Sequence, residues 1–153
     1  MILLDVSFGI FAFLPQGWIF MVFVIILECL AMTRLLLPKW FDNKIYKIAA
    51  LSNIISGLTG IIISMIVNGG WYLVVWFPWV SSNEINLSHK GALKELMFFY
   101  VLAFVLTLII ETIINVLFLR NHYSNQKIIR ATFIANILSY AVGSIVLYSY
   151  SFG

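Results

Sequence analysis

Two glutamates lie inside long apolar stretches of this chain of 153 residues, where an acidic side chain is unusual. Glu28 stands in the run Val-Ile-Ile-Leu-Glu-Cys-Leu, and Glu111 stands in the run Leu-Ile-Ile-Glu-Thr-Ile-Ile. A carboxyl group surrounded by hydrocarbon is unstable unless it is protonated, paired or hydrogen-bonded. The chemistry open to these two acids is the relay of protons or cations, or hydrogen bonding to neighbouring polar groups.

The polar residues recur along the chain at one constant shift, the one that places Glu28 on Glu111. This shift, the repeat offset, also places Asn53 on Asn136 without a gap. The other polar, small and basic matches are Ser56 with Ser139, Gly60 with Gly143, Lys44 with Lys127, and Lys47 with Arg130. These matches indicate an internal repeat that covers residues 28–62 and 111–145. Each copy contains a helix with a glutamate, a short basic loop and a second helix, so the chain is predicted to form two tandem helical hairpins.

Small polar residues follow helical spacing in the second helix of each copy. Asn53, Ser56 and Gly60 are three and four residues apart, which puts them on one helical face. The last helix repeats this spacing in Asn136, Ser139, Tyr140 and Gly143. Asn115 follows Glu111 by one turn. Because amides and hydroxyls supply hydrogen bonds between helices and glycines allow close approach, we expect a polar network inside each hairpin, with both glycines as packing positions. The alternative is a proton or cation path through the two glutamates.

Four apolar stretches carry these residues, at about 18–37, 48–67, 96–119 and 129–148. A hydrocarbon core of ~30 Å needs roughly 20 helical residues to cross it. The whole chain is 63% hydrophobic and only 10% charged. Since soluble domains are about 25% charged, too few polar side chains are available here to cover a water-soluble surface. The prediction is a single all-α domain over residues 1–153, a polytopic membrane protein with four transmembrane helices whose solvent is the lipid bilayer.

The basic residues predict how the chain sits in the membrane. Seven of the nine Lys and Arg residues flank the two short loops: Arg34, Lys39, Lys44, Lys47, Arg120, Lys127 and Arg130. Lys90 and Lys94 fall on the opposite side. By the positive-inside rule the short loops are cytoplasmic, both termini face outward, and the net charge of +3 reflects orientation in the plasma membrane and not nucleic-acid binding. The Trp-rich stretch 71–79 is too short to cross a bilayer and is expected at its interface.

The sequence lacks the residue patterns that metal sites, catalytic triads and phosphate-binding loops require. His89 and His122 fall in loops on opposite sides, and neither has nearby Cys or carboxylate residues for a metal site. The sequence has no Ser-His-Asp set, glycine-rich phosphate loop or Cys-x-x-Cys motif. We therefore expect no enzymatic activity, no catalytic residues, no metal and no cofactor.

Three short patches resemble the FraC family of cyanobacterial filament-integrity membrane proteins. They are Glu28 in the first helix, Asn53-Ile-Ile-Ser56 with Gly60 in the second, and Ile134-Ala-Asn136-Ile-Leu-Ser139-Tyr140 in the last. The resemblance implies a structural or assembly function in the plasma membrane, with cell-cell or septal organisation as its setting, and implies no catalytic residues. Together with the composition, it leads us to expect a membrane subunit that packs with itself as a homo-oligomer or with other membrane proteins. The alternative is a small proton- or cation-coupled channel or transporter that uses the two glutamates.

Overall fold

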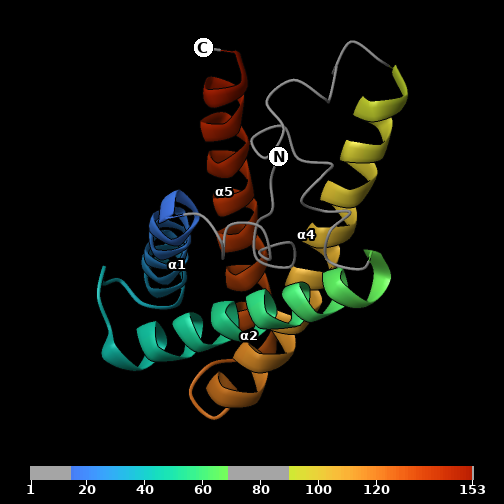
Figure 1. The fold of residues 1–153 in the computed structure, drawn as a ribbon. Coiled ribbons are helices and arrows are strands. Elements are labelled where there is room, and N and C mark those ends of the chain that lie inside the picture. Colours follow the sequence, from blue (N-terminus) through green and yellow to red (C-terminus); the bar gives the residue numbers. More distant parts are fainter. Residues whose placement is uncertain (1–14, 69–89, 153) are drawn as a thin grey trace.

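A computed structural model of the chain describes residues 15–68 and 90–152, and these residues form four α-helices (Figure 1). The helices are α1 (Pro15–Leu36), α2 (Asn43–Asn68), α4 (Lys90–Leu119) and α5 (Asn125–Phe152). Within these two ranges the structure contains no strand, so the predicted all-α class is confirmed. The stretch 71–79, expected at a membrane interface, lies outside the described residues.

All four helices are longer than the apolar stretches that predicted them, and three of them begin four or more residues earlier. α2 begins at Asn43 instead of 48, α4 at Lys90 instead of 96, and α5 at Asn125 instead of 129. These added turns carry polar and basic side chains such as Lys44 and Lys47. The physical reason is that helical hydrogen bonding continues past the apolar residues, whereas hydropathy marks only the apolar part of each helix.

The connection between α1 and α2 has local signals that end one helix and begin the next. α1 ends at Leu36, two residues before Pro38, which disfavours helical conformation at the residue that precedes it. Asp42 then caps α2, because its Oδ1 atom accepts hydrogen bonds from the backbone amides of Lys44 at 3.0 Å and Ile45 at 3.2 Å. Short connections of this kind join α1 to α2 and α4 to α5 as two helical hairpins.

The two hairpins pack so that each helix touches one helix of the other hairpin. α1 contacts α2 and α5, and α4 contacts α5 and α2. In Figure 1 α2 crosses α4 at a steep slant and does not run along its whole length. The four helices therefore form a closed ring of contacts, α1 to α2 to α4 to α5 and back to α1.

An apolar cluster joins the loop ends of the two hairpins. Leu36, Ile45, Leu119 and Ile128 are at its centre, and none of them is more than 2% exposed. The two leucines are related by the repeat offset, and so are the two isoleucines. Lys127 also crosses between the hairpins at this end, donating a hydrogen bond from Nζ to the backbone oxygen of Leu36 at 3.0 Å.

Further from the loops the usual distribution of polar and apolar side chains is reversed. The interior holds a buried set of acids, amides and hydroxyls: Glu28, Thr33, Ser52, Asn53, Ser56, Thr107, Glu111, Asn115, Thr132, Asn136 and Ser139. The exposed surface of every helix carries large apolar side chains, among them Ile26, Leu58, Ile113 and Ile137. Among the described residues, the segment Val101–Leu119 of α4 is the one that is both long and apolar enough to cross a membrane.

Candidate functional site

The polar interior is centred on the two glutamates. Glu28 comes from the middle of α1 and Glu111 from α4, and each is 1% exposed. Both side chains line the same narrow interior space, although the two residues belong to different hairpins.

Each glutamate is bound by the asparagine of its own hairpin. Asn53 donates from Nδ2 to Glu28 Oε2 at 3.0 Å, and Asn136 donates from Nδ2 to Glu111 Oε2 at 2.8 Å. The second hydrogen of each amide goes to a backbone oxygen four residues earlier, that of Ala49 at 3.0 Å or Thr132 at 3.1 Å. Both hydrogens of each amide are therefore used, and the arrangement in one hairpin repeats in the other.

The serines behave differently, because each one reaches the glutamate of the other hairpin. Ser56 Oγ on α2 is 3.0 Å from Glu111 Oε1, and Ser139 Oγ on α5 contacts Glu28 Oε1. The expectation of a network inside each hairpin therefore holds for the asparagines and fails for the serines. The reason is the packing of α2 on α4 and of α5 on α1, which turns the serine face of each second helix toward the opposite hairpin.

A count of hydrogens indicates how the glutamates are protonated. Ser56 Oγ lies 3.0 Å from Glu111 Oε1 and also 3.0 Å from the backbone oxygen of Asn53, yet a hydroxyl has a single hydrogen. Ser139 has the equivalent two neighbours. Both contacts of one hydroxyl become full hydrogen bonds when the carboxyl group is protonated and donates to the serine oxygen. The geometry thus favours neutral acids that act as donors.

Three amide oxygens in the same region have no hydrogen-bond partner. They are Oδ1 of Asn53, Asn115 and Asn136, whose residues are 3%, 1% and 0% exposed. All three residues and both glutamates border one enclosed space, which is too narrow to hold a water molecule. Carboxyl and amide oxygens are ligands for protons and hard cations, and not for soft metals. Among the described residues there is no group of three or more His, Cys, Asp or Glu that could hold a metal ion.

The second hairpin contains a hydrogen bond that the first hairpin lacks. Asn115 donates from Nδ2 to Thr132 Oγ1 at 3.1 Å, and the threonine hydroxyl in turn points to Met32 Sδ at 3.7 Å. By the repeat offset, Asn115 and Thr132 correspond to Met32 and Ala49, which cannot form this bond. The repeat is therefore symmetric at the glutamates and asymmetric one turn away.

The remaining predicted residues also lie in the interior. Tyr140 is 4% exposed, and its hydroxyl is 3.2 Å from Thr107 Oγ1. The ring of Phe104 packs edge-on against the tyrosine ring, with centroids 4.9 Å apart. Gly60 and Gly143 are buried. The structure thus gathers all eight polar positions and both glycines inside the four helices.

Sequence reasoning missed two residues whose hydroxyls bond to other side chains of this interior, Thr107 and Thr132. Both are fully or almost fully buried, at 0% and 1% exposed. A signal for them was present, because Thr107 precedes Glu111 by four residues and Thr132 precedes Asn136 by four. Threonine is common in apolar helices and bonds readily to its own backbone, so its spacing alone gives a weak prediction.

Comparisons of the chain with protein-family models, with curated proteins and with solved structures found no match.

Proposed function

We propose that this chain is an integral membrane protein in which all four helices cross the bilayer. The large apolar side chains exposed on α1, α2, α4 and α5 suit contact with lipid, since a surface of this kind would associate in water. The shortest of these helices, α1, has 22 residues, about 33 Å at 1.5 Å per residue, and the hydrocarbon core is ~30 Å thick. The hydrogen-bonded interior supports the same placement, because polar groups in lipid must find partners within the protein.

The same proposal places both short loops in the cytoplasm and both termini outside the plasma membrane. The basic side chains at the loop ends support it: Arg34, Lys39, Lys44, Lys47, Arg120, Lys127 and Arg130 are all exposed. Basic residues near the ends of membrane helices favour the cytoplasmic side. A cysteine introduced at Asn43 or Asn125, in a Cys29→Ala background, should react with a membrane-impermeant maleimide in inverted vesicles and not in intact cells.

Within the membrane, the function that the geometry supports best is that of a structural or assembly subunit. The observation that carries this proposal is the pair of serine contacts between hairpins, Ser56 to Glu111 and Ser139 to Glu28. These contacts use the polar groups inside the chain and leave an apolar outer face for other membrane components. The subunit would be non-enzymatic and would pack with copies of itself or with other membrane proteins.

The resemblance to the FraC family adds a biological setting to this proposal, namely the organisation of contacts between cells or at septa. Self-association in the membrane is the property to measure first. Two fluorescently labelled pools of the chain, reconstituted together in vesicles, should show energy transfer that rises with protein density and is lost on dilution with unlabelled protein. A chain that stays monomeric at every density would contradict the homo-oligomer, and a monomeric state in native membranes as well would contradict the assembly role.

A second candidate function is a small proton- or cation-coupled channel or transporter. The specific observation in its favour is the pairing of two buried acids with three unpartnered amide oxygens around one narrow space. Protonatable acids inside membrane helices are typical of such paths. Proteoliposomes test it: Glu28→Gln and Glu111→Gln should abolish proton or sodium flux without loss of folded protein. Equal flux in the wild type and in both variants would remove this candidate.

A further inference from the structure

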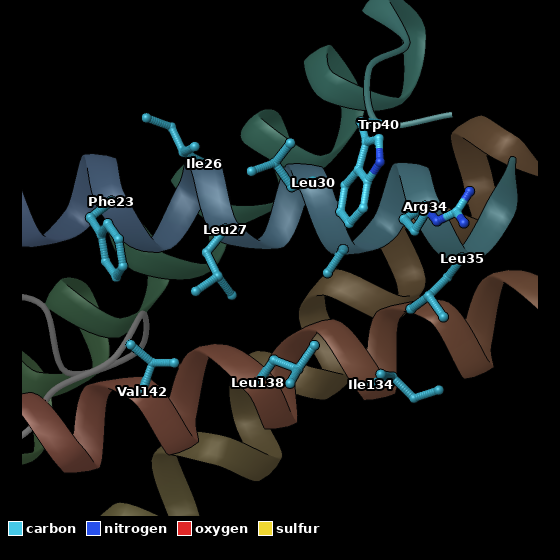
Figure 2. A pocket seen from close by; sticks show the side chains of 11 residues that line it. Phe23, Ile26, Leu27, Leu30, Arg34, Leu35, Trp40, Ile134, Leu138 and Val142 are labelled. Carbon is cyan, nitrogen blue, oxygen red and sulfur yellow. The ribbon is translucent and has the colours of Figure 1, made fainter. Parts of the chain in front are cut away.

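A groove on the outer face of the molecule runs between α1 and α5. It has a volume of about 450 Å³, within the range of small-molecule pockets. Its walls are almost entirely apolar, and in Figure 2 Phe23 and Leu27 on α1 point toward α5 while Leu138 and Val142 on α5 point back toward α1. A long, open, apolar groove on a lipid-facing surface has the shape and polarity to hold an acyl chain.

The end of this groove near the α1–α2 loop is not purely apolar, because Arg34 and Trp40 lie there together (Figure 2). The guanidinium carbon of Arg34 is 5.3 Å from the centroid of the Trp40 ring, a cation–π contact that leaves the donors of the guanidinium group available. Both side chains are exposed. Among the acids whose side chains the structure describes, none pairs with Arg34, because Asp42 caps α2 and the two glutamates are buried in the network.

The internal repeat shows that the scaffold does not need this arginine. By the repeat offset, Arg34 corresponds to Leu117 and Trp40 corresponds to Tyr123. Leu117 is itself 54% exposed, so an apolar side chain is tolerated at the equivalent place on the other hairpin. An arginine beside hydrocarbon is less favourable than a leucine. Its presence at one hairpin alone therefore points to a role specific to the α1–α5 groove.

We propose that this groove binds an anionic phospholipid, with an acyl chain between α1 and α5 and the phosphate at the guanidinium group of Arg34. The inference rests on the proposed placement in the membrane. The charge of Arg34 complements the phosphate, and Trp40 has the amphipathic ring that favours the headgroup level. Basic sites between membrane helices on the cytoplasmic side are known to hold anionic headgroups, and the exposed residues of the two loops make this end of the molecule strongly basic.

The test compares two lipids that differ only in the headgroup. Full-length chain in a mild detergent is titrated with phosphatidylglycerol or phosphatidylcholine of identical acyl chains, and bound lipid is counted by native mass spectrometry. The wild type should prefer phosphatidylglycerol. Arg34→Leu should lower that preference by about fivefold, the effect of one basic residue near an anionic headgroup. Arg120→Leu is the matched control, because Arg120 is exposed in the other loop and does not line the groove; its preference should equal that of the wild type.

A second variant tests the acyl-chain part of the site. Ala31 lines the groove, so Ala31→Phe should fill it and lower retention of both lipids equally. Equal affinity of the wild type for the two lipids, or equal losses in Arg34→Leu and Arg120→Leu, would overturn the proposal. So would an Ala31→Phe variant that changes the oligomeric state and not lipid retention, since the groove would then be a protein interface. An alkaline wash of membranes distinguishes failure of the membrane placement from failure of the lipid site. Release of the chain by the wash would contradict the membrane placement. Retention of the chain, together with no headgroup preference, would contradict only the lipid site.

Discussion

The hydroxyl of Ser139 on α5 hydrogen-bonds the carboxyl group of Glu28 on α1, joining residues 111 positions apart. The equivalent pair makes the same contact with the hairpins exchanged: Ser56 lies on the first hairpin and Glu111 on the second. These two contacts tie the hairpins together at the centre of the molecule. The asparagine contacts act differently, because each of them links two helices of one hairpin.

Removal of either serine hydroxyl is expected to loosen the hairpins from each other. Ser56→Ala and Ser139→Ala should each lower the free energy of unfolding by about 1 kcal/mol, within the range measured for hydrogen bonds between membrane helices. Unfolding in a detergent titration, followed by helix content, measures the loss. Thr59→Val is the control, because the Thr59 hydroxyl bonds only the backbone oxygen of Ile55 in its own helix. Equal stability of all four proteins would show that the serines do not hold the hairpins.

Neutral glutamates should tolerate replacement by glutamine far better than replacement by alanine. A glutamine keeps an acceptor and a donor at the position, so Glu28→Gln and Glu111→Gln should unfold within about 1 kcal/mol of the wild type. Glu28→Ala removes the partner of Asn53 and Ser139 and should cost about 1–3 kcal/mol for each buried group left unpaired. The same detergent titration measures both kinds of variant, and a glutamine variant as unstable as the alanine variant would argue for an ionised acid.

The protonated acids also have a direct spectroscopic signature. The infrared difference spectrum between the wild type and Glu28→Gln at neutral pH should contain the carbonyl stretch of a protonated carboxyl group. Glu111→Gln should remove a band of the same kind, because the two residues have equivalent partners. A difference spectrum with only carboxylate bands would contradict the hydrogen count at the serines. Asp42→Asn, at the cap of α2 beside the loop, supplies the comparison for an acid outside the network.

The asymmetric bond between Asn115 and Thr132 allows a test by exchange of residues between the hairpins. Thr132→Ala leaves the Asn115 amide without its acceptor and should lower stability by about 1–3 kcal/mol. The double variant Asn115→Met with Thr132→Ala copies Met32 and Ala49 of the first hairpin and should regain most of that loss, because both partners are removed together. A double-mutant cycle of unfolding free energies measures the coupling. A double variant less stable than Thr132→Ala would show that the second hairpin cannot accept the packing of the first.

Lys127 should stabilise the contact between the loop ends. Its ammonium group reaches the backbone oxygen of Leu36 at the C-terminal end of α1, where positive charge is favourable. Lys127→Met should therefore cost about 0.3–1 kcal/mol at low salt and less at high salt, because screening weakens the charge interaction. Unfolding titrations at two salt concentrations measure this. Lys47→Met, at an exposed position on α2, should have a smaller effect, and equal effects of the two variants would contradict the role of Lys127.

The helical class and the identity of the polar residues follow from the sequence by itself. Continuous apolar stretches predict helices because a chain in lipid must satisfy its backbone hydrogen bonds internally. The repeat offset relates Glu28 to Glu111 and Asn53 to Asn136 from their positions in the chain alone. The helix ends were predicted less accurately, because hydropathy does not detect the polar turns at Asn43, Lys90 and Asn125.

Only the tertiary structure decided which polar group meets which. Periodicity fixes the face of a helix on which Ser56 and Ser139 lie, but it does not fix the helix that packs against that face. The packing of α2 on α4 and of α5 on α1 directs each serine to the other hairpin's glutamate. The packing of α1 on α5 also forms the groove that Arg34 and Trp40 line at its loop end. Local sequence determines which side chains lie on each face of a helix. Which helix packs against that face depends on the free energy of packing all four helices together.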